Sequence, residues 1–528
     1  MKASLPPGKV PGIPITSSRA NRASTPRPYP LSRQAEQWQA FPMHDALIRL
    51  TATEAVTRLR RREVSPLELI DAAEARIVAV EPQVNALPTL CLDRARDHAK
   101  RLMAGQGREL EGKAGWLAGL PVTIKDLTDV AGVRTTYGSP IFKDHVPKDS
   151  HPLVKRIEAH GGIVIAKSNT PEFGAGGSTF NEVFGRTRNP WNTSLTCGGS
   201  TGGGAVSLAA GEAWLAQGSD HGGSLRRPAT YCGVVGLRPS PGRVTRGTVN
   251  NLFSPLSVQG PMARNVPDLA LFLDSMAGWC ALDPLTYDAP ARSYAEAVAA
   301  AGAERPKRIA FTADFNGQLP VDRETRALCS QAVRAFEAAG CVVEEFAPDL
   351  GQLGEAFLIL RSQSFVVDRE AQLATHRDLL KPDIIWNTER GLKATPSQLA
   401  WADRERAAFY RRMTALFARY DVFVTPGAAT PAFDVMLRNP ETIAGVKLEN
   451  YMAGSMINAA LTLAGCPAVA VPCGFDQYGR PIGLQIAAPP RRDEVALQAA
   501  ALFEQVSGLA QQVPIDPRPG QVPPAEPA

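Results

Sequence analysis

The stretch Cys197–Gly242 decides the fold and reads CGGSTGGGAVSLAAGEAWLAQGSDHGGSLRRPATYCGVVGLRPSPG. It contains two clusters rich in glycine and serine, Cys197–Gly204 and Gln217–Ala229, and the apolar segment Ala213–Ala216 precedes the second one. A strand that runs into a glycine turn exposes a serine at the end of the turn and points successive backbone N–H groups at one spot. The second cluster therefore predicts a strand followed by an oxyanion-binding turn that ends on Ser224.

The first cluster, around Ser200, allows several interpretations. A flexible linker is disfavoured because apolar sequence flanks the cluster on both sides. A phosphate-binding loop would need the lysine of the GxxxxGK[ST] motif, which the cluster lacks. Gly198-x-Ser200-x-Gly202 also matches the nucleophile elbow of α/β hydrolases. An elbow follows a buried strand, however, and residues 189–194 do not predict one, so we do not assign Ser200 as the attacking group.

A lysine ends the β-branched apolar run Gly119–Asp126. Lys125 must either extend its amine to water or be held neutral by burial and neighbouring dipoles. A desolvated lysine can serve as a general base near neutral pH. From this run alone, both interpretations stay open.

Taken together, these three elements resemble the amidase signature family. Lys125 falls on the family's general base, Ser200 on the first serine of its GGSSGG stretch, and Ser224 on the nucleophile of its GSDxGGSxRxPA stretch. The resemblance extends through flanking sequence to cover roughly residues 43–506. Thr201 replaces the second serine of the usual pair, and this change removes no catalytic atom.

The resemblance implies a serine acyl-enzyme mechanism without a cofactor or a metal ion. Neutral Lys125 takes a proton from Ser200, Ser200 takes one from Ser224, and Ser224 attacks the carbonyl carbon. The resemblance also places a cis peptide bond between Gly199 and Ser200. The oxyanion would be stabilised by the backbone N–H groups of His221, Gly222, Gly223 and Ser224.

His221 suggests a different mechanism, a Ser-His-Asp triad with Ser224 and Asp220. We reject it because residues three apart on a tight glycine turn cannot easily bring the imidazole to Ser224 Oγ. The lysine relay already explains how the serine is activated. Asp220 and Arg226 are interpreted as supports for the turn.

The substrate-binding residues are less well defined. By position, Gly174, Ala175 and Gly176 are expected to border the leaving-group side, and their small size would leave room for a bulky or aromatic group. Residues 350–450 depart most from a common core and are expected to cover the pocket. Candidate apolar walls are Phe357, Leu360, Ile385, Trp386 and Tyr451.

The wider sequence predicts an α/β fold, because short β-rich runs alternate with amphipathic stretches. The resemblance implies one large mixed β-sheet covered by helices on both faces. Expected strands are 162–165, 308–311, 342–343, 421–424, 468–471 and 483–486, and expected helices are 268–276, 323–339, 396–420 and 493–506.

The ends of the chain differ from its body. Residues 41–110 have helical periodicity, and Ser65-Pro66-Leu67-Glu68 predicts a capped helix start, so we expect an N-terminal helical layer. Residues 1–40 contain seven prolines and no apolar run, which predicts a disordered basic leader. The amidase signature domain is expected to end near residue 510, and a proline-rich tail follows at 511–528.

Composition limits the partners. The formal net charge is +5, but the leader alone carries six basic residues and one acidic residue, so the body is nearly neutral. A nucleic-acid partner is therefore not expected. Eight scattered cysteines without a CxxC pair favour free thiols in a cytoplasmic protein. The sequence contains no run of about 18 apolar residues, so it predicts no membrane-spanning helix.

We expect an amidase that hydrolyses C–N bonds of small aryl or alkyl amides, and also esters and carbamates, which present a carbonyl to the same nucleophile. Its partner would be a small-molecule amide substrate, and a possible homodimer follows from the family resemblance. The alternative is the A subunit of a tRNA-dependent glutamyl/aspartyl amidotransferase, which needs further subunits to act.

Overall fold

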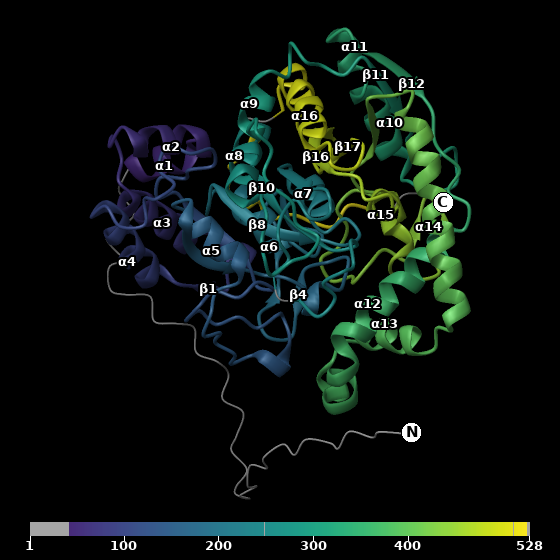
Figure 1. Cartoon of the computed structure of the whole chain (residues 1–528), viewed down its shortest axis with the longest axis horizontal. Coiled ribbons are helices and arrows are strands. Elements are labelled where there is room, and N and C mark those ends of the chain that lie inside the picture. The colour runs from purple at the N-terminus through teal and green to yellow at the C-terminus, as the bar shows by residue number, and fades with distance from the viewer. Residues whose placement is uncertain (1–41, 248, 510–511, 525–528) are drawn as a thin grey trace, which may run out of the picture. The chain divides into compact units, whose positions relative to one another are not determined.

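The strand that leads into the Ser224 turn lies inside an eleven-stranded mixed sheet (Figure 1). The structure is a computed structural model and describes residues 42–247, 249–509 and 512–524. In sheet order the strands are β1 (Thr89–Leu90), β3 (Ile163–Ser168), β2 (Pro121–Lys125), β8 (Leu215–Asp220), β10 (Val258–Ala263), β9 (Val235–Arg238), β16 (Ala468–Phe475), β17 (Pro481–Ala487), β13 (Val422–Pro426), β11 (Arg308–Phe311) and β12 (Val342–Glu345).

Strand directions place the candidate site at one edge of this sheet. β2 pairs in parallel with both β3 and β8, while β10 runs antiparallel to β8 and to β9. The carboxyl ends of neighbouring parallel strands open onto the same edge, where loops can gather functional side chains. Lys125 and Asp220, the last residues of β2 and β8, both lie at that edge.

Helices pack around the sheet, so the predicted α/β fold with one large mixed sheet and covering helices is confirmed. Their bounds are α1 (Pro42–Arg49), α2 (Ala52–Arg60), α3 (Pro66–Val84), α4 (Leu92–Met103), α5 (Pro152–Ala159), α6 (Gly202–Ala209), α7 (Arg226–Cys232), α8 (Val266–Met276), α9 (Tyr294–Ala299), α10 (Arg323–Ala332), α11 (Ala335–Ala338), α12 (Leu353–His376), α13 (Pro382–Leu392), α14 (Pro396–Phe417), α15 (Met456–Leu463) and α16 (Asp493–Ser507).

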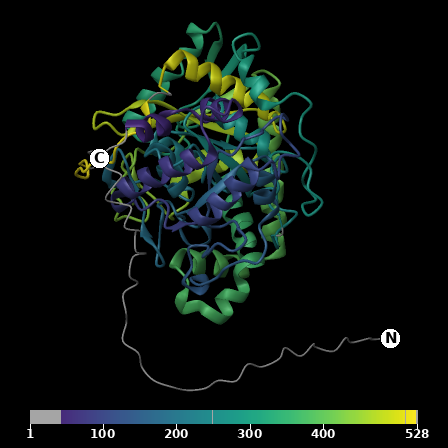
Figure 2. The ribbon, with the colours of Figure 1, turned by 90° about the vertical axis from the view of Figure 1, so that its left-hand side faces the viewer.

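The N-terminal helices form a layer beside the β1–β3–β2 edge. Helices α3 and α4 contact each other, α3 contacts β2, and α4 contacts β3; Figures 1 and 2 show α1–α4 grouped together there. Helix α3 starts with the expected capping box, in which Ser65 accepts the Glu68 N–H and the Glu68 carboxylate accepts the Ser65 N–H. Such reciprocal bonds satisfy donors that a helix start otherwise leaves free.

Three details differ from the sequence predictions. The stretch before Ser200 does form a strand, β7 (Asn192–Thr196), but it pairs with β6 (Arg188–Asn189) in a small separate sheet and, through Leu195, forms an isolated bridge with Asp434. The elbow topology, in which the strand belongs to the central sheet, is therefore absent from this described segment. The helix expected at 323–339 is interrupted between α10 and α11, and α14 ends three residues earlier than expected.

The proline-rich tail lies against the body along residues 512–524. The Ile515 N–H donates to Ala209 O at 2.9 Å, and Arg518 O accepts the Thr193 N–H at 2.9 Å. Arg76 adds a hydrogen bond from Nη2 to Ile515 O. The leader predicted at residues 1–40 lies outside the described residues.

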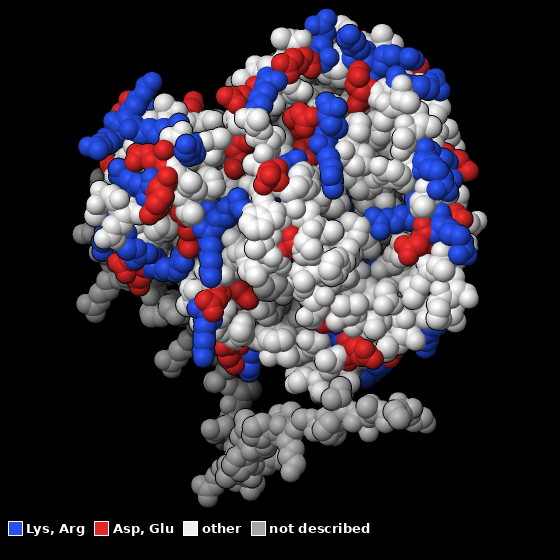
Figure 3. Space-filling view, in the orientation of Figure 1, with Lys and Arg blue, Asp and Glu red and all other residues white. Residues whose placement is uncertain are grey.

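Two surface properties bear on partners. None of the helices in the described part of the chain is both long and apolar enough to cross a membrane. On the face drawn in Figure 3, basic and acidic residues are interspersed, and the central region is largely uncharged.

Candidate active site

Three segments bring the candidate catalytic side chains together. Lys125 ends β2, and the neighbouring parallel strand β8 ends at Asp220. The turn that follows β8 carries Ser224, and the loop that leads into α6 carries Ser200. The sheet edge therefore joins residues that lie far apart in the sequence.

The Lys125 side chain is completely buried, so the interpretation in which its amine extends to water is wrong. Hydrogen bonds join its Nζ to Ser200 Oγ at 2.7 Å, Thr201 Oγ1 at 2.9 Å and Ser219 Oγ at 3.1 Å. Burial lowers the pKa of Lys125 to about 7, although the charge of Asp220 opposes this shift. Removing water disfavours the charged amine, so much of the lysine is neutral near pH 7 and can accept a proton.

Ser200 is held next to this amine by the glycine-rich loop. The Gly199–Ser200 peptide bond is cis, as the family resemblance implied. Ser200 is only 2% exposed, yet it lines the cavity in front of the sheet edge. Gly199 O accepts a hydrogen bond from Arg227 Nη2 at 3.2 Å, which anchors the loop. The serine hydroxyl is thus in contact with both the lysine and the cavity.

Asp220 fixes the turn that follows β8, as predicted. Its carboxylate accepts the N–H groups of Gly223 and Leu225, each at 3.0 Å. Arg226 Nη2 and Arg238 Nη1 also donate to it, at 2.9 and 3.2 Å. Burial raises the pKa of Asp220, but the two arginine charges outweigh burial and hold the pKa well below its usual value. The carboxylate is therefore ionised, and its hydrogen bonds hold the turn in place.

The oxyanion-hole prediction needs a correction at Gly223. The Gly223 N–H donates to Asp220, so it does not face the cavity as an unused donor. Its φ of +107° turns the peptide toward the carboxylate, a conformation that favours glycine. The N–H groups of Gly222 and Ser224 form no hydrogen bond within the described residues. These two are better candidates than Gly223 for binding a negatively charged oxygen.

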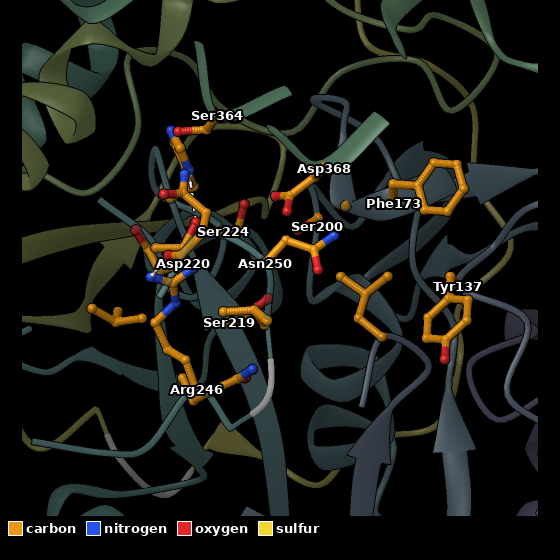
Figure 4. A pocket seen from close by; sticks show the side chains of 18 of the residues that line it. Tyr137, Phe173, Ser200, Ser219, Asp220, Ser224, Arg246, Asn250, Ser364 and Asp368 are labelled. Atoms are coloured by element: carbon orange, nitrogen blue, oxygen red, sulfur yellow. Dashed lines mark hydrogen bonds between the residues drawn. The ribbon is translucent and has the colours of Figure 1, made fainter. Parts of the chain in front are cut away.

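Ser200 and Ser224 share one cavity but are not hydrogen-bonded to each other in the described residues. Both line it, and Figure 4 shows their side chains with Asn250 drawn next to Ser200. No hydrogen bond joins the two hydroxyls in the described residues, whereas Lys125 and Ser200 are already bonded. Catalytic hydrogen bonds are often long before substrate binds, so the second contact of the relay would form on substrate binding.

His221 forms no hydrogen bond to Ser224 in the described residues, which agrees with our rejection of a histidine triad. Its Nδ1 hydrogen-bonds Ser257 Oγ at 2.7 Å, and its Nε2 is buried without a partner among the described residues. The ring packs edge-on against Phe357, with centroids 5.9 Å apart. Burial, followed by the charge of Arg361, holds the pKa of His221 well below its usual value. A neutral imidazole is therefore part of the cavity wall.

Comparison with known proteins identifies the family. The Amidase family model matches residues 68–497, which is most of the chain. This chain belongs to the amidase family. It is 35% identical over 473 residues to an acylamidase of Rhodococcus erythropolis, covering 88% of this chain and 97% of the relative. It is also 33% identical over 495 residues to the A subunit of the glutamyl-tRNA(Gln) amidotransferase of Halothermothrix orenii, covering 88% and 98%.

Solved structures agree with this assignment. A bacterial aryl acylamidase of the amidase signature family superposes with a TM-score of 0.80 at 27% identity, covering 88% of this chain and 97% of that one. The peptide amidase of Stenotrophomonas maltophilia superposes with a TM-score of 0.69 at 26% identity, covering 89% and 98%. The chain is therefore an amide-hydrolysing enzyme of the amidase signature type.

The amidase cavity has a volume of about 450 Å³ and two chemically different ends. Tyr137, Phe142 and Phe173 form an aromatic end, with ring centroids 5.1 Å apart in the first pair and 6.1 Å apart in the second. Arg246 lies nearer to Ser224 in Figure 4, whereas Tyr137 and Phe173 lie beyond Ser200. The cavity can thus receive an aromatic group on the Ser200 side.

Helix α12 covers the cavity, but with residues other than those predicted. Its cavity-lining face consists of Arg361, Ser364, Phe365, Asp368 and Arg369. The expected walls Leu360, Ile385, Trp386 and Tyr451 do not line this cavity, because they pack among the helices of the covering segment. Phe357 is fully buried behind His221.

The positions of the cavity-lining residues along α12 show why the predicted wall residues were wrong. Positions 361, 364, 365 and 368 follow helical periodicity and form one face, and this face is mostly polar. The walls expected from the sequence were all apolar or aromatic side chains. A search for polar residues at helical spacing in the predicted covering segment could have found this face.

Of the three small residues expected beside the leaving group, only Gly174 lines the cavity. A Cβ on Gly174 would lie 3.4 Å from Ser200 Oγ, so no side chain separates this backbone from the relay serine. Ala175 packs instead against Leu380 and Ile384, and a Cβ on Gly176 would approach Lys381 Nζ at 2.9 Å. Ala175 and Gly176 therefore contact the residues packed against this loop and do not border the cavity.

No group of three or more histidine, cysteine, aspartate or glutamate side chains among the described residues could hold a metal ion. Sequence reasoning did not assign Ser219 or Thr201 to the site, although both hydroxyls hydrogen-bond the lysine amine. The threonine therefore keeps the hydroxyl that the family's second serine would supply.

Proposed function

We propose that Ser224 is the nucleophile of this amidase, Ser200 the proton relay and Lys125 the general base. Ser224 passes its proton to Ser200 while Ser200 passes its own to the neutral lysine. The Ser224 oxygen then bonds to the substrate carbonyl carbon, and the carbonyl oxygen becomes an oxyanion near the N–H groups of Gly222 and Ser224. The C–N bond breaks, the relay returns a proton to the amine, and water hydrolyses the acyl-enzyme.

The contact that supports this proposal most strongly is the 2.7 Å hydrogen bond between the buried Lys125 amine and Ser200 Oγ. A lysine with a pKa of about 7 can accept a proton at neutral pH. The donors at the turn can supply the oxyanion site, whose individual contacts are worth roughly 3 to 4 kcal/mol.

The proposed substrates are small amides with an aryl or alkyl amine, and also esters and carbamates. The leaving nitrogen must face Ser200 to receive its proton. The rings of Tyr137 and Phe173 lie on that side in Figure 4, and Phe142 packs against both. Aromatic groups pack favourably edge-to-face against such rings. The acylamidase and aryl acylamidase named above are consistent with this substrate class.

Purified protein offered 4-nitroacetanilide should release 4-nitroaniline without a partner protein. The Ser224→Ala variant serves as the control for adventitious hydrolysis, and 4-nitrophenyl acetate and a phenyl carbamate test the wider substrate range. The proposal fails if the wild-type chain and the alanine variant release the amine at the same rate.

The similarity to the amidotransferase favours a second candidate function, hydrolysis of glutamine within a larger complex. Glutamine added to the chain alone should give no ammonia under either hypothesis. Glutaminase activity that appears only with partner proteins, together with inactivity toward every anilide, would favour the amidotransferase. The homodimer stays a prediction that light scattering on the purified chain can test.

A further inference from the structure

Arg361 is a buried cation in the wall of the catalytic cavity. It lies on the cavity-facing side of α12 and is only 5% exposed. Among the described residues, no carboxylate lies within salt-bridge distance of its guanidinium. Burying an unpaired charge is costly, and proteins usually pair such charges or use them to bind ligands.

The surroundings of Arg361 orient its guanidinium without neutralising it. Nη2 donates to the Tyr451 hydroxyl at 2.9 Å, and the group lies 4.8 Å from the ring centroid of Phe365. Nε is buried without a partner among the described residues. Nη1 likewise forms no hydrogen bond there, so donors remain for a ligand in the cavity. A planar guanidinium held in this way is suited to a carboxylate.

In the proposed mechanism, the guanidinium would lie on the acyl side of the reacting carbonyl. Arg361 follows Phe357 by one helical turn, and Phe357 packs against His221 and next to Gly222. In the proposed mechanism, the leaving nitrogen would face Ser200, beside which the backbone of Gly174 lies. A group extending from the carbonyl carbon away from the nitrogen would therefore approach Arg361.

The acidic residues of the cavity do not neutralise this guanidinium. Asp129 accepts the Tyr137 hydroxyl at 2.7 Å, at the aromatic end. Asp220 is already bonded to two other arginines. Asp368 lies two helical turns from Arg361 on the same helix, and no salt bridge joins the two side chains in the described residues. The charge of Arg361 thus remains available to a substrate.

We propose that Arg361 binds a carboxylate on the acyl part of the substrate, so that the preferred substrates are monoamides of dicarboxylic acids. This inference rests on the proposed function, because it uses the assigned positions of the nucleophile and the leaving nitrogen. It specifies the acyl half of the substrate, and the aromatic end accommodates the amine half.

Matched pairs of 4-nitroanilides test the preference. Each pair consists of two separate substrates. One is the monoanilide of a dicarboxylic acid, such as the succinyl, glutaryl or adipoyl anilide. The other is the anilide of the same length that ends in a methyl ketone, which has the same shape but no charge. For the best chain length, wild-type kcat/KM should favour the carboxylate by about 10-fold or more, the effect expected of a charge-assisted hydrogen bond. Arg361→Gln should remove this preference but keep activity on the ketone, and Arg361→Lys should restore part of it.

Arg390→Gln is the matched control, because Arg390 hydrogen-bonds Glu355 and does not line the catalytic cavity. It should leave the preference unchanged. Calorimetric titration of Ser224→Ala with the uncleaved pairs gives a second measurement that needs no turnover. Equal binding and equal rates for carboxylate and ketone, at every chain length, would overturn the inference. If no anilide is cleaved by the wild type, the proposed function fails, and the titration alone still decides whether Arg361 binds a carboxylate.

Discussion

The pH dependence of hydrolysis tests the assignment of Lys125 as base. With a pKa of about 7, the neutral fraction of the lysine is about 9% at pH 6 and about 91% at pH 8. Because only the neutral amine accepts a proton, kcat/KM should rise about 10-fold over this interval and then level off. A lysine with its ordinary pKa would instead give a rise of about 100-fold that continues beyond pH 9.

The assay is release of 4-nitroaniline from 4-nitroacetanilide, whose own charge does not change over this range. A histidine could produce a similar profile, so His221→Asn serves as the matched control. Its apparent pKa should equal that of the wild type, since the pKa of His221 lies well below its usual value. A rate that peaks near pH 5, or an apparent pKa that disappears in His221→Asn, would refute the lysine assignment.

Five substitutions separate the roles of neighbouring residues. His221→Ala should keep kcat/KM within about 10-fold of wild type, whereas Ser224→Ala and Lys125→Ala should lose about 1000-fold or more; equal losses in anilide hydrolysis would contradict the relay. Asp220→Asn should lower the free energy of unfolding by about 3 to 5 kcal/mol, because it leaves two buried arginines unpaired; a urea denaturation change below about 1 kcal/mol would argue against this support. Gly174→Ala should reduce kcat/KM by about 10-fold or more, because φ is +73° and a Cβ would lie 3.4 Å from the relay hydroxyl; unchanged kinetics would show that the loop adapts.

Sequence patterns predicted the central sheet well where the signal was local. The runs that became β3, β11, β13, β16 and β17 are β-rich and bounded by turns, and both features act within a few residues. Strand order and direction depend on contacts between distant segments, so only family resemblance could supply the mixed sheet. The break between α10 and α11 was missed because the amphipathic pattern continues across it.

The site could be predicted to the same extent as the sheet: local sequence signals were informative, and contacts between distant segments were not. Lys125, Ser200 and Ser224 were assigned because their three motifs together resemble those of the family, although each motif alone left alternatives open. The use of the Gly223 N–H by Asp220 depends on turn geometry, and periodicity gives no information about that. Arg361 was missed because its role depends on which face of α12 meets the cavity, and that orientation is set by packing of the covering helices.

Identification of the nucleophilic residue tests the central claim most directly. A fluorophosphonate, which reacts irreversibly with activated serine nucleophiles, should label the wild-type chain once, and peptide mass spectrometry should place the adduct on Ser224. Labelling should be abolished in Ser224→Ala and greatly slowed in Lys125→Ala. An adduct on Ser200, or undiminished labelling of Ser224→Ala, would contradict the division of labour in which Ser224 attacks, Ser200 relays and Lys125 accepts the proton.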